Sequence, residues 1–341
     1  MLSKGKICYL RITGFVMSQL DDASILITGG TGSLGKALIH HLMEKTKVRR
    51  IAIYSRDELK QLNLRNDIGE DERLRWFIGD IRDLERLKRA LHGVDFVIHA
   101  AALKQVDTGE YNPMEFIKTN VLGSQNVIDA SIEAGVKKVV ALSTDKASSP
   151  INLYGATKLT ADKLFVAANN YSHSYGTTFS VVRYGNVMGS RGSVIPLWKS
   201  LAEAGLPLPI TDLRMTRFWI SIDQAVQFVM DSLEIMCGGE LYVPRIPSMR
   251  IAELASAVAP NANLKEIGMR PGEKLHEEMI SADDSRRTFL IGDRYVVTPV
   301  VAEWGYQAPN GTPMAEGVAY QSQTNDLWIS QEDIRKFLNE I

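Results

Sequence analysis

Short apolar runs alternate with longer amphipathic segments along the first half of the chain. The apolar runs predict buried strands at residues 24–28, 50–54, 74–78, 94–99, 139–142 and 179–184. The segments between them predict helices, among them residues 36–44 and 113–134. Strands that alternate with helices of this length favour an α/β fold with a doubly wound parallel sheet.

A glycine-rich loop follows the first predicted strand and opens the first predicted helix. Glycines in such a loop let the backbone turn tightly and approach a pyrophosphate, which the helix N-terminus attracts. The position between a strand and a helix makes the pattern specific for a Rossmann-type dinucleotide site. The expected cofactor contacts in this loop are Gly29, Thr31, Gly32, Ser33, Leu34 and Gly35.

The end of the second strand bears on the choice of cofactor. Ser55, Arg56 and Lys60 predict a clamp for a 2′-phosphate, which favours NADP over NAD. The alternative is that these are solvated charges at a helix start. Asp57 and Glu58 are suited to capping that next helix.

The ends of the third and fourth strands add further candidates. Asp80 and Ile81 are expected beside the adenine, and small residues at Ala100, Ala101 and Ala102 leave room for the flat body of the cofactor. Lys104 is a candidate for either the cofactor or a substrate diphosphate, and a plain surface lysine is the alternative. Asn120, in the long helical pattern, is a further cofactor candidate.

The fifth strand ends in Thr144, Asp145 and Lys146, and Tyr154 and Lys158 follow at the start of a helical pattern. A spacing of four places the tyrosine and the lysine on one helix face. An ammonium that lowers the pKa of the phenol would let it take a hydroxyl proton. An additional acid and base would permit loss of water. The alternative is a strand, a turn and a helix with scattered polar residues.

The regular alternation of predicted strands and helices ends near residue 190. Helical patterns occur at 193–204, 223–236 and 330–340, whereas 301–327 is polar with little periodicity. We expect four parts: a flexible N-terminal extension, an NADP-binding Rossmann domain whose core continues intermittently to about residue 240, a smaller C-terminal substrate-binding lobe, and a tail with a terminal helix. Their expected bounds are 1–20, 21–190, 191–300 and 301–341.

Composition narrows the functional classes. A net charge of −1 gives no basic field for nucleic acid or an anionic membrane, and no run approaches the ~20 apolar residues of a membrane span. The six histidines lack metal-ligand spacing, so no metal is expected. Two cysteines and an N-terminus without the apolar core of a signal peptide favour a cytoplasmic location.

These motifs together resemble the extended short-chain dehydrogenase/reductase family, and within it the soluble C5-inverting UDP-N-acetylglucosamine 4,6-dehydratases. The resemblance extends from about residue 24 to 279 and includes Ser-Thr-Asp-Lys-Ala at 143–147, Asn-Leu-Tyr-Gly-Ala-Thr-Lys at 152–158 and Arg-Pro-Gly-Glu-Lys-Leu-His-Glu at 270–277. The pair Asp145-Lys146 is the specific feature, because C5-retaining dehydratases usually have Asp-Glu there and 4-epimerases have neither pair. Gln105 departs from the histidine that these relatives often carry.

The resemblance implies a mechanism and a set of ligands. Tyr154, helped by Lys158 and Thr144, would take the C4 hydroxyl proton while hydride passes to NADP. Lys146, with a lowered pKa, would remove the C5 proton, and Asp145, with a raised pKa, would protonate the departing C6 hydroxyl. Hydride return and reprotonation from the opposite face would give UDP-2-acetamido-2,6-dideoxy-β-L-arabino-hexos-4-ulose, the first intermediate of pseudaminic acid synthesis. The substrate contacts expected are Lys104, Asn186, Val194, Thr211, Met215, Arg217, Arg270 and Glu273, in which the arginines would bind the diphosphate.

Three alternatives stay open at this point: a C5-retaining dehydratase, a UDP-sugar 4-epimerase and a non-enzymatic NADP-binding scaffold. The configuration of the product at C5 distinguishes a retaining dehydratase from an inverting one. A 4-epimerase would release no deoxy sugar. A homo-oligomer, either a dimer or a hexamer, is expected from the family.

Overall fold

The computed structural model describes residues 19–188 and 194–340. Most of the predicted N-terminal extension lies outside these residues, as does the segment just before Val194. None of the described helices has the length and hydropathy needed to span a membrane. Within the same residues, no group of three or more histidine, cysteine or acidic side chains is arranged to hold a metal ion.

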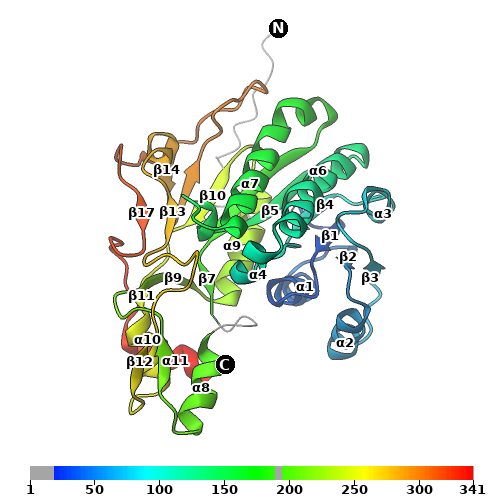
Figure 1. Ribbon diagram of the computed structural model, residues 1–341. Coiled ribbons are helices and arrows are strands. Elements are labelled where there is room, and N and C mark those ends of the chain that lie inside the picture. The colour runs from blue at the N-terminus through cyan, green and yellow to red at the C-terminus, as the bar shows by residue number, and fades with distance from the viewer. Residues whose placement is uncertain (1–18, 189–193, 341) are drawn as a thin grey trace.

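A large twisted sheet dominates the molecule (Figure 1). In the described part of the chain its ten strands follow the order β16-β14-β15-β10-β6-β5-β4-β1-β2-β3. The parallel strands from β3 to β10 form the centre and one side. Their bounds are β1 (Ser24–Thr28), β2 (Arg50–Ser55), β3 (Leu74–Ile78), β4 (Phe96–His99), β5 (Lys138–Thr144), β6 (Thr178–Tyr184) and β10 (Leu241–Pro244). The doubly wound parallel sheet predicted from the sequence is confirmed.

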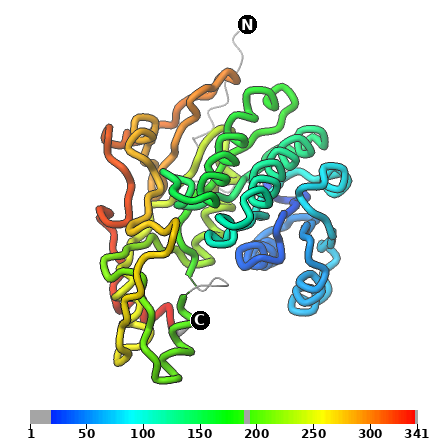
Figure 2. Tube along the Cα trace, in the orientation of Figure 1, coloured from blue at the N-terminus to red at the C-terminus, as the bar shows by residue number. Residues whose placement is uncertain are grey.

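Helices cover both faces of this sheet because side chains alternate along each buried strand. Leu26 packs into one apolar core, whereas its neighbours Ile25 and Ile27 pack into the other. The first core lies under helices α3, α6 and α7, and the second lies under α1, α2 and α9 (Figures 1 and 2). These helices are α1 (Ser33–Lys45), α2 (Glu58–Ile68), α3 (Leu84–Ala90), α6 (Gly123–Glu133), α7 (Leu153–Ser172) and α9 (Ile222–Ile235).

The helical pattern predicted at 113–134 is interrupted by a wider turn. It consists of α5 (Pro113–Phe116), the π-helical turn η1 (Ile117–Leu122) and α6, and it is preceded by α4 (Val106–Tyr111). A π-helical turn within a helix shifts the side chains that follow it and is frequent at functional sites. The two short 3₁₀ turns of this half of the chain are η2 (Asp145–Ala147) and η3 (His173–Tyr175).

The sheet continues beyond its parallel strands with segments from later in the chain. Beyond β10 it gains the antiparallel strands β15 (Arg294–Val297), β14 (Thr288–Ile291) and β16 (Thr312–Pro313), with the turn η4 (Asp284–Arg287) before them. The prediction had assigned these residues to the lobe and the tail. Their short, irregular apolar runs give no signal that they complete a sheet begun more than 200 residues earlier.

A smaller lobe lies beside the carboxyl ends of the parallel strands (Figure 1). Its core is built around the fully buried Trp198, which donates a hydrogen bond to the Pro209 carbonyl. The helices of the lobe are α8 (Val194–Glu203), α10 (Ile251–Val258) and α11 (Gln331–Glu340), and its two-stranded sheet joins β8 (Leu208–Ile210) and β12 (Leu264–Glu266).

Two further small sheets connect the lobe to the main sheet. One contains β7 (Asn186–Val187), β9 (Thr216–Ile220) and β11 (Ser248–Arg250), and the other pairs β13 (Glu278–Ile280) with β17 (Tyr320–Gln321). The polar region after residue 301 therefore includes a strand that binds back against the body of the protein.

Candidate active site

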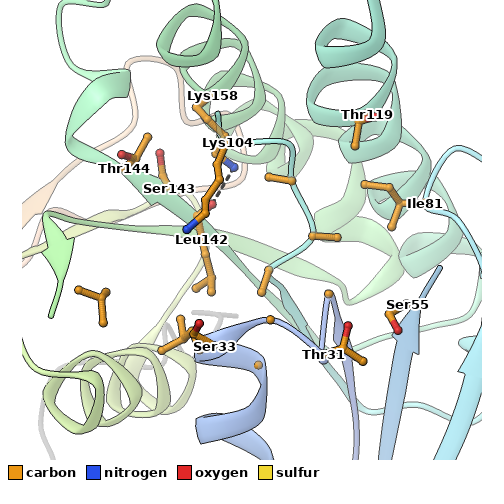
Figure 3. Close-up of a pocket in the computed structure, with 18 of the residues that line it drawn as sticks. Thr31, Ser33, Ser55, Ile81, Lys104, Thr119, Leu142, Ser143, Thr144 and Lys158 are labelled. Carbon is orange, nitrogen blue, oxygen red and sulfur yellow. Dashed lines mark hydrogen bonds between the residues drawn. The ribbon is translucent and has the colours of Figure 1, made fainter. Parts of the chain in front are cut away.

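A cavity of about 610 Å³ opens at the carboxyl ends of the parallel strands. It lies where the strand order reverses between β1 and β4, the place at which ligands bind in sheets of this kind. Loops that follow β1, β2, β3, β4, β5 and β6 all contribute to its lining. Figure 3 shows residues from these loops around one space, with Thr31 and Ser33 on one side and Lys104 and Lys158 on the other.

The glycine-rich loop lines one side of the cavity, and at two of its positions there is no room for a side chain. Gly29 has φ +69°, and a Cβ there would lie 2.8 Å from the Ala101 backbone. A Cβ at Gly35 would lie 2.6 Å from the Gly30 Cα atom. Helix α1 has Gly32 as its N-cap, without a side-chain cap and without an acidic residue in its first turn. This end of the helix therefore suits an anionic group. All six loop residues expected to contact a cofactor line the cavity: Gly29, Thr31, Gly32, Ser33, Leu34 and Gly35.

The predicted 2′-phosphate clamp lies at the far end of the same cavity. Ser55, Arg56 and Lys60 line it, as do Asp80 and Ile81. Both cations are already paired with carboxylates, because Arg56 lies 3.6 Å from Asp80, and Lys60 lies 2.9 Å from Asp57. Asp57 also caps α2, as predicted, by accepting a hydrogen bond from the Lys60 backbone.

Asn120 has a different role from the expected cofactor contact. Its side chain is buried. The Oδ1 atom accepts a hydrogen bond from the Leu103 N–H at 2.8 Å. The Nδ2 group donates to the Leu103 carbonyl at 2.9 Å and to the Thr157 hydroxyl at 3.0 Å. Asn120 therefore fixes the loop after β4 to α7, whereas the neighbouring Thr119 lines the cavity (Figure 3). The expected contacts from that loop, which line the cavity, are Ala100, Ala101, Ala102 and Lys104.

The catalytic candidates come together where β5 runs into η2 and α7 begins. Thr144 donates a hydrogen bond to Asp145 Oδ1 at 2.9 Å, and Lys146 Nζ donates to the same oxygen at 3.1 Å. Asn152 caps α7 through the Gly155 N–H at 2.7 Å. Gly155 lets α7 approach η2 closely, since a Cβ at this position would lie 2.1 Å from the Lys146 carbonyl oxygen. Thr144, Asp145, Lys146, Tyr154 and Lys158 all line the cavity.

Tyr154 and Lys158 both lie on α7, where Tyr154 is half-buried and Lys158 is buried. Lys158 Nζ donates to the Leu142 carbonyl at 2.7 Å (Figure 3), and burial lowers its pKa. Burial raises the pKa of Tyr154 to about 12, although Lys146 and a hydrogen bond with Thr144 act in the opposite direction. The expected lowering of the phenol pKa is therefore wrong here, because desolvation outweighs the nearby cation.

Asp145 and Lys146 share one buried charge network with a third residue, Glu277. Burial raises the pKa of Asp145, as an acid that must hold a proton requires. Burial acts to lower the pKa of Lys146, but attraction to Asp145 and Glu277 outweighs it and raises that pKa. The expected lowering of the Lys146 pKa is thus wrong, because Glu277 Oε1 lies 3.0 Å from its ammonium, a contact between distant residues that no local sequence pattern predicts.

The expected substrate contacts are divided between the cavity and its surroundings. Asn186 lines the cavity together with Lys104, and its buried Oδ1 atom has no hydrogen-bond partner among the described residues. Arg217 is buried and pairs with Glu273 at 3.3 Å, whereas Arg270 is exposed. Met215 belongs to the buried interior, and Val194 and Thr211 are half-buried in the lobe. The expected substrate contacts that lie outside the cavity lining are Val194, Thr211, Met215, Arg217, Arg270 and Glu273.

Sequence reasoning missed several lining residues. Leu142, Ser143, Tyr184 and Val187 follow or precede predicted strand ends, so the strand pattern could have found them. Glu277 had only a weak signal, namely its place at the end of the Arg270–Glu277 motif.

Comparison with known proteins identifies the family to which this chain belongs. A family model described as "Polysaccharide biosynthesis protein" matches residues 25–299. The chain belongs to the polysaccharide biosynthesis protein family. Among curated members of similar sequence, the UDP-N-acetylglucosamine 4,6-dehydratase (inverting) of Campylobacter jejuni strain 81-176 is 54% identical, over 94% of this chain and 98% of that protein. A UDP-glucose 4-epimerase of Rickettsia canadensis is 42% identical, over 80% and 82% of the two chains.

Two solved structures show the same fold. The structure of Pen from Bacillus thuringiensis superposes with a TM-score of 0.86 and 37% identity, over 94% of this chain and 98% of that one. DesIV, the dTDP-glucose 4,6-dehydratase of Streptomyces venezuelae, solved with NAD and TYD bound, has a TM-score of 0.67 and 26% identity, over 74% and 86% of the two chains.

Proposed function

We propose that this protein is a UDP-N-acetylglucosamine 4,6-dehydratase that inverts the configuration at C5. The observation that carries the proposal is the grouping of an acid, a base and a tyrosine in the same cavity as a glycine-rich loop that suits a dinucleotide. Asp145 and Lys146 lie within 3.1 Å of each other, and Tyr154 lines the same space. The named activity of the Campylobacter relative supports this choice.

A nicotinamide dinucleotide fits the residues present. The glycine-rich loop, the uncapped N-terminus of α1 and the small residues after β4 would accept its pyrophosphate and ring system. When bound, such a group would supply the acceptor for hydride from C4 of the sugar and the donor of hydride to C6, so no external reductant would be consumed. NADP is our choice over NAD, since Arg56 and Lys60 flank Ser55 at the adenosine end. A 2′-phosphate there would replace the present pairings of these cations with Asp80 and Asp57.

The side chains divide the proton transfers among them. Tyr154, in its phenolate form, takes the C4 hydroxyl proton, and Lys146, in its amine form, takes the C5 proton that the new 4-ketone acidifies. Asp145, protonated, gives its proton to the C6 hydroxyl, which leaves as water. Hydride added at C6 and a solvent-derived proton added to the opposite face of C5 would give the L-configured 4-keto-6-deoxy sugar, a precursor for pseudaminic acid.

A 4-epimerase is the second candidate function, because the Rickettsia relatives are named UDP-glucose 4-epimerases. An epimerase needs neither Asp145 nor Lys146. The test is to incubate the purified protein with UDP-N-acetylglucosamine, without added reductant, and to follow the sugar by NMR. A new methyl signal with loss of the C4 proton supports the dehydratase. UDP-N-acetylgalactosamine without a methyl signal would refute it.

We also propose a homo-oligomer, either a dimer or a hexamer. Exposed apolar side chains gather on the helical run from α4 to α6, where Tyr111 is 88% exposed, Met114 is 55% exposed and Leu122 is 54% exposed. Surfaces of this kind are frequently covered by a second subunit. Light scattering coupled to gel filtration gives the subunit number, and a monomer at all concentrations would contradict the proposal.

A further inference from the structure

Glu277 is an almost fully buried carboxylate that contacts the proposed base. It precedes β13, and its exposed fraction is 1%. Its Oε1 atom accepts a hydrogen bond from Lys146 Nζ at 3.0 Å and lies 3.7 Å from Arg217 Nε. Its Oε2 atom is also buried, with no hydrogen-bond partner among the described residues. A buried carboxylate in direct contact with a reacting amine has consequences for that amine.

The backbone around Glu277 is held firmly by the tail of the chain. The Glu277 N–H donates to Ser322 Oγ at 3.0 Å, and its carbonyl accepts from the Ser322 N–H at 2.8 Å. Ser322 Oγ is in turn hydrogen-bonded to Thr216 Oγ1 at 2.7 Å, next to Arg217. The polar tail region, which had no assigned role, therefore fixes the backbone that carries this carboxylate.

The pKa values of the two carboxyls beside Lys146 are shifted in opposite directions. Burial raises the pKa of Asp145 against the opposing attraction of Lys146, and the negative charge of Glu277 adds to the rise. Burial also acts to raise the pKa of Glu277, but Lys146 and Arg217 outweigh it and lower that pKa. These opposite directions favour the negative charge on Glu277 over a negative charge on Asp145, and acid–base sites commonly separate the pKa values of neighbouring carboxyls in this way. Several charged or titratable groups surround Lys146 and Glu277. They come from η2, α7, β9, the loop before β13 and β13 itself, and they are Asp145, Tyr154, Arg217, Glu273, Lys274 and Glu278.

We propose that Glu277 is a positioning residue that holds Lys146 beside Asp145 and supplies the buried negative charge that both of them share. The inference rests on the dehydratase function proposed above. In this role Glu277 does not touch the sugar. It sets how readily Lys146 gives up its proton and how firmly Asp145 keeps its own.

The pH dependence of kcat/KM tests this role, because its two limbs report the acid and the base of the free enzyme. Glu277→Gln removes a negative charge, so the pKa of Lys146 and the pKa of Asp145 both fall. Both limbs of the profile should therefore move to lower pH, by about one to three units. A merely structural glutamate would lower activity or stability without displacing the profile. A folded Glu277→Gln enzyme whose profile coincides with that of the wild type would overturn the proposal.

Two further variants complete the design. Glu278→Gln is the matched control, because Glu278 bonds Ser148 and Ser149 and makes no contact with Lys146, so its profile should not move. Glu277→Asp keeps the charge but withdraws it from Lys146, so a smaller displacement in the same direction is expected. If the glutamine variant does not fold, the aspartate variant decides: an undisplaced profile counts against the proposal. Wild-type turnover is measured first, since a wild type that makes no 4-keto-6-deoxy sugar refutes the proposed function itself.

Discussion

Helix α7 and turn η2 lie in close backbone contact at Gly155. Gly155→Ala perturbs this contact with a single methyl group. The added Cβ would lie 2.1 Å from the Lys146 carbonyl oxygen, whereas ordinary contact begins at 3.4 Å. The two segments would therefore have to separate by roughly 1.3 Å, the difference between these distances. Because η2 carries Asp145 and Lys146 and α7 carries Tyr154, the separation changes the geometry of the site directly.

Two opposing terms set the size of the effect on stability. Alanine in place of glycine within a helix gains about 1 kcal/mol from helix propensity. Overpacking of a closed contact costs about 1–3 kcal/mol, and the backbone oxygen that would be struck here is not easily moved. We expect a net loss in the free energy of unfolding. A misplacement of about 1 Å between catalytic groups lowers activity by about 100-fold, so kcat/KM should fall by that order.

Urea unfolding and dehydratase kinetics on the same preparation measure both quantities. Thr160→Ala is the matched control, because Thr160 is exposed on the same helix, and it should leave both nearly unchanged. A Gly155→Ala protein that is more stable than the wild type and equally active would refute the close contact, and with it the argument that α7 and η2 position the acid and the base together.

Three other predictions follow from single contacts. His99 is buried against Thr28, and burial lowers its pKa from 6.5 to about 3; stability that is present above pH 6.5 should be lost as the pH falls towards 3, and acid unfolding of His99→Asn should show a flatter dependence over that window. Asn120→Ala removes three hydrogen bonds of a buried side chain, two of which fix the Leu103 backbone; the free energy of unfolding in urea should fall by about 1–3 kcal/mol, with a higher Kd for the dinucleotide, and an unchanged Kd would contradict the fixing role. Arg56→Ala should raise the Kd for NADP about tenfold to a hundredfold in calorimetry and leave that for NAD nearly constant, whereas equal changes for both would argue against a 2′-phosphate contact.

The parts of the fold predicted from sequence are those with local signals. The strand, glycine loop and helix around Gly29–Gly35 are adjacent in the chain, so their pattern fixes the local geometry. The same holds for β5, η2 and the start of α7, where Thr144 to Lys158 lie within one continuous stretch. Parallel strands of this kind end at one edge of the sheet, which is why side chains from distant loops were expected to gather there.

The parts that could not be predicted depend on contacts between distant residues. Glu277 meets Lys146 across 131 positions, and no local pattern reports that pairing or the raised Lys146 pKa that results. Asn120 was expected to contact the cofactor because of its place, but its three hydrogen bonds are all made within the protein. Strands β14, β15 and β16 are too short to be recognised without the sheet that they complete.

The most direct test of the central claim is turnover of UDP-N-acetylglucosamine in D2O, without added reductant, with the C5 position of the product examined by NMR. Removal of the C5 proton by Lys146 and reprotonation from the opposite face predict a 4-keto-6-deoxy product that carries deuterium at C5 in the L-configuration, and no such product from Lys146→Ala. A product that retains the D-configuration, or one formed equally well by Lys146→Ala, would contradict the account.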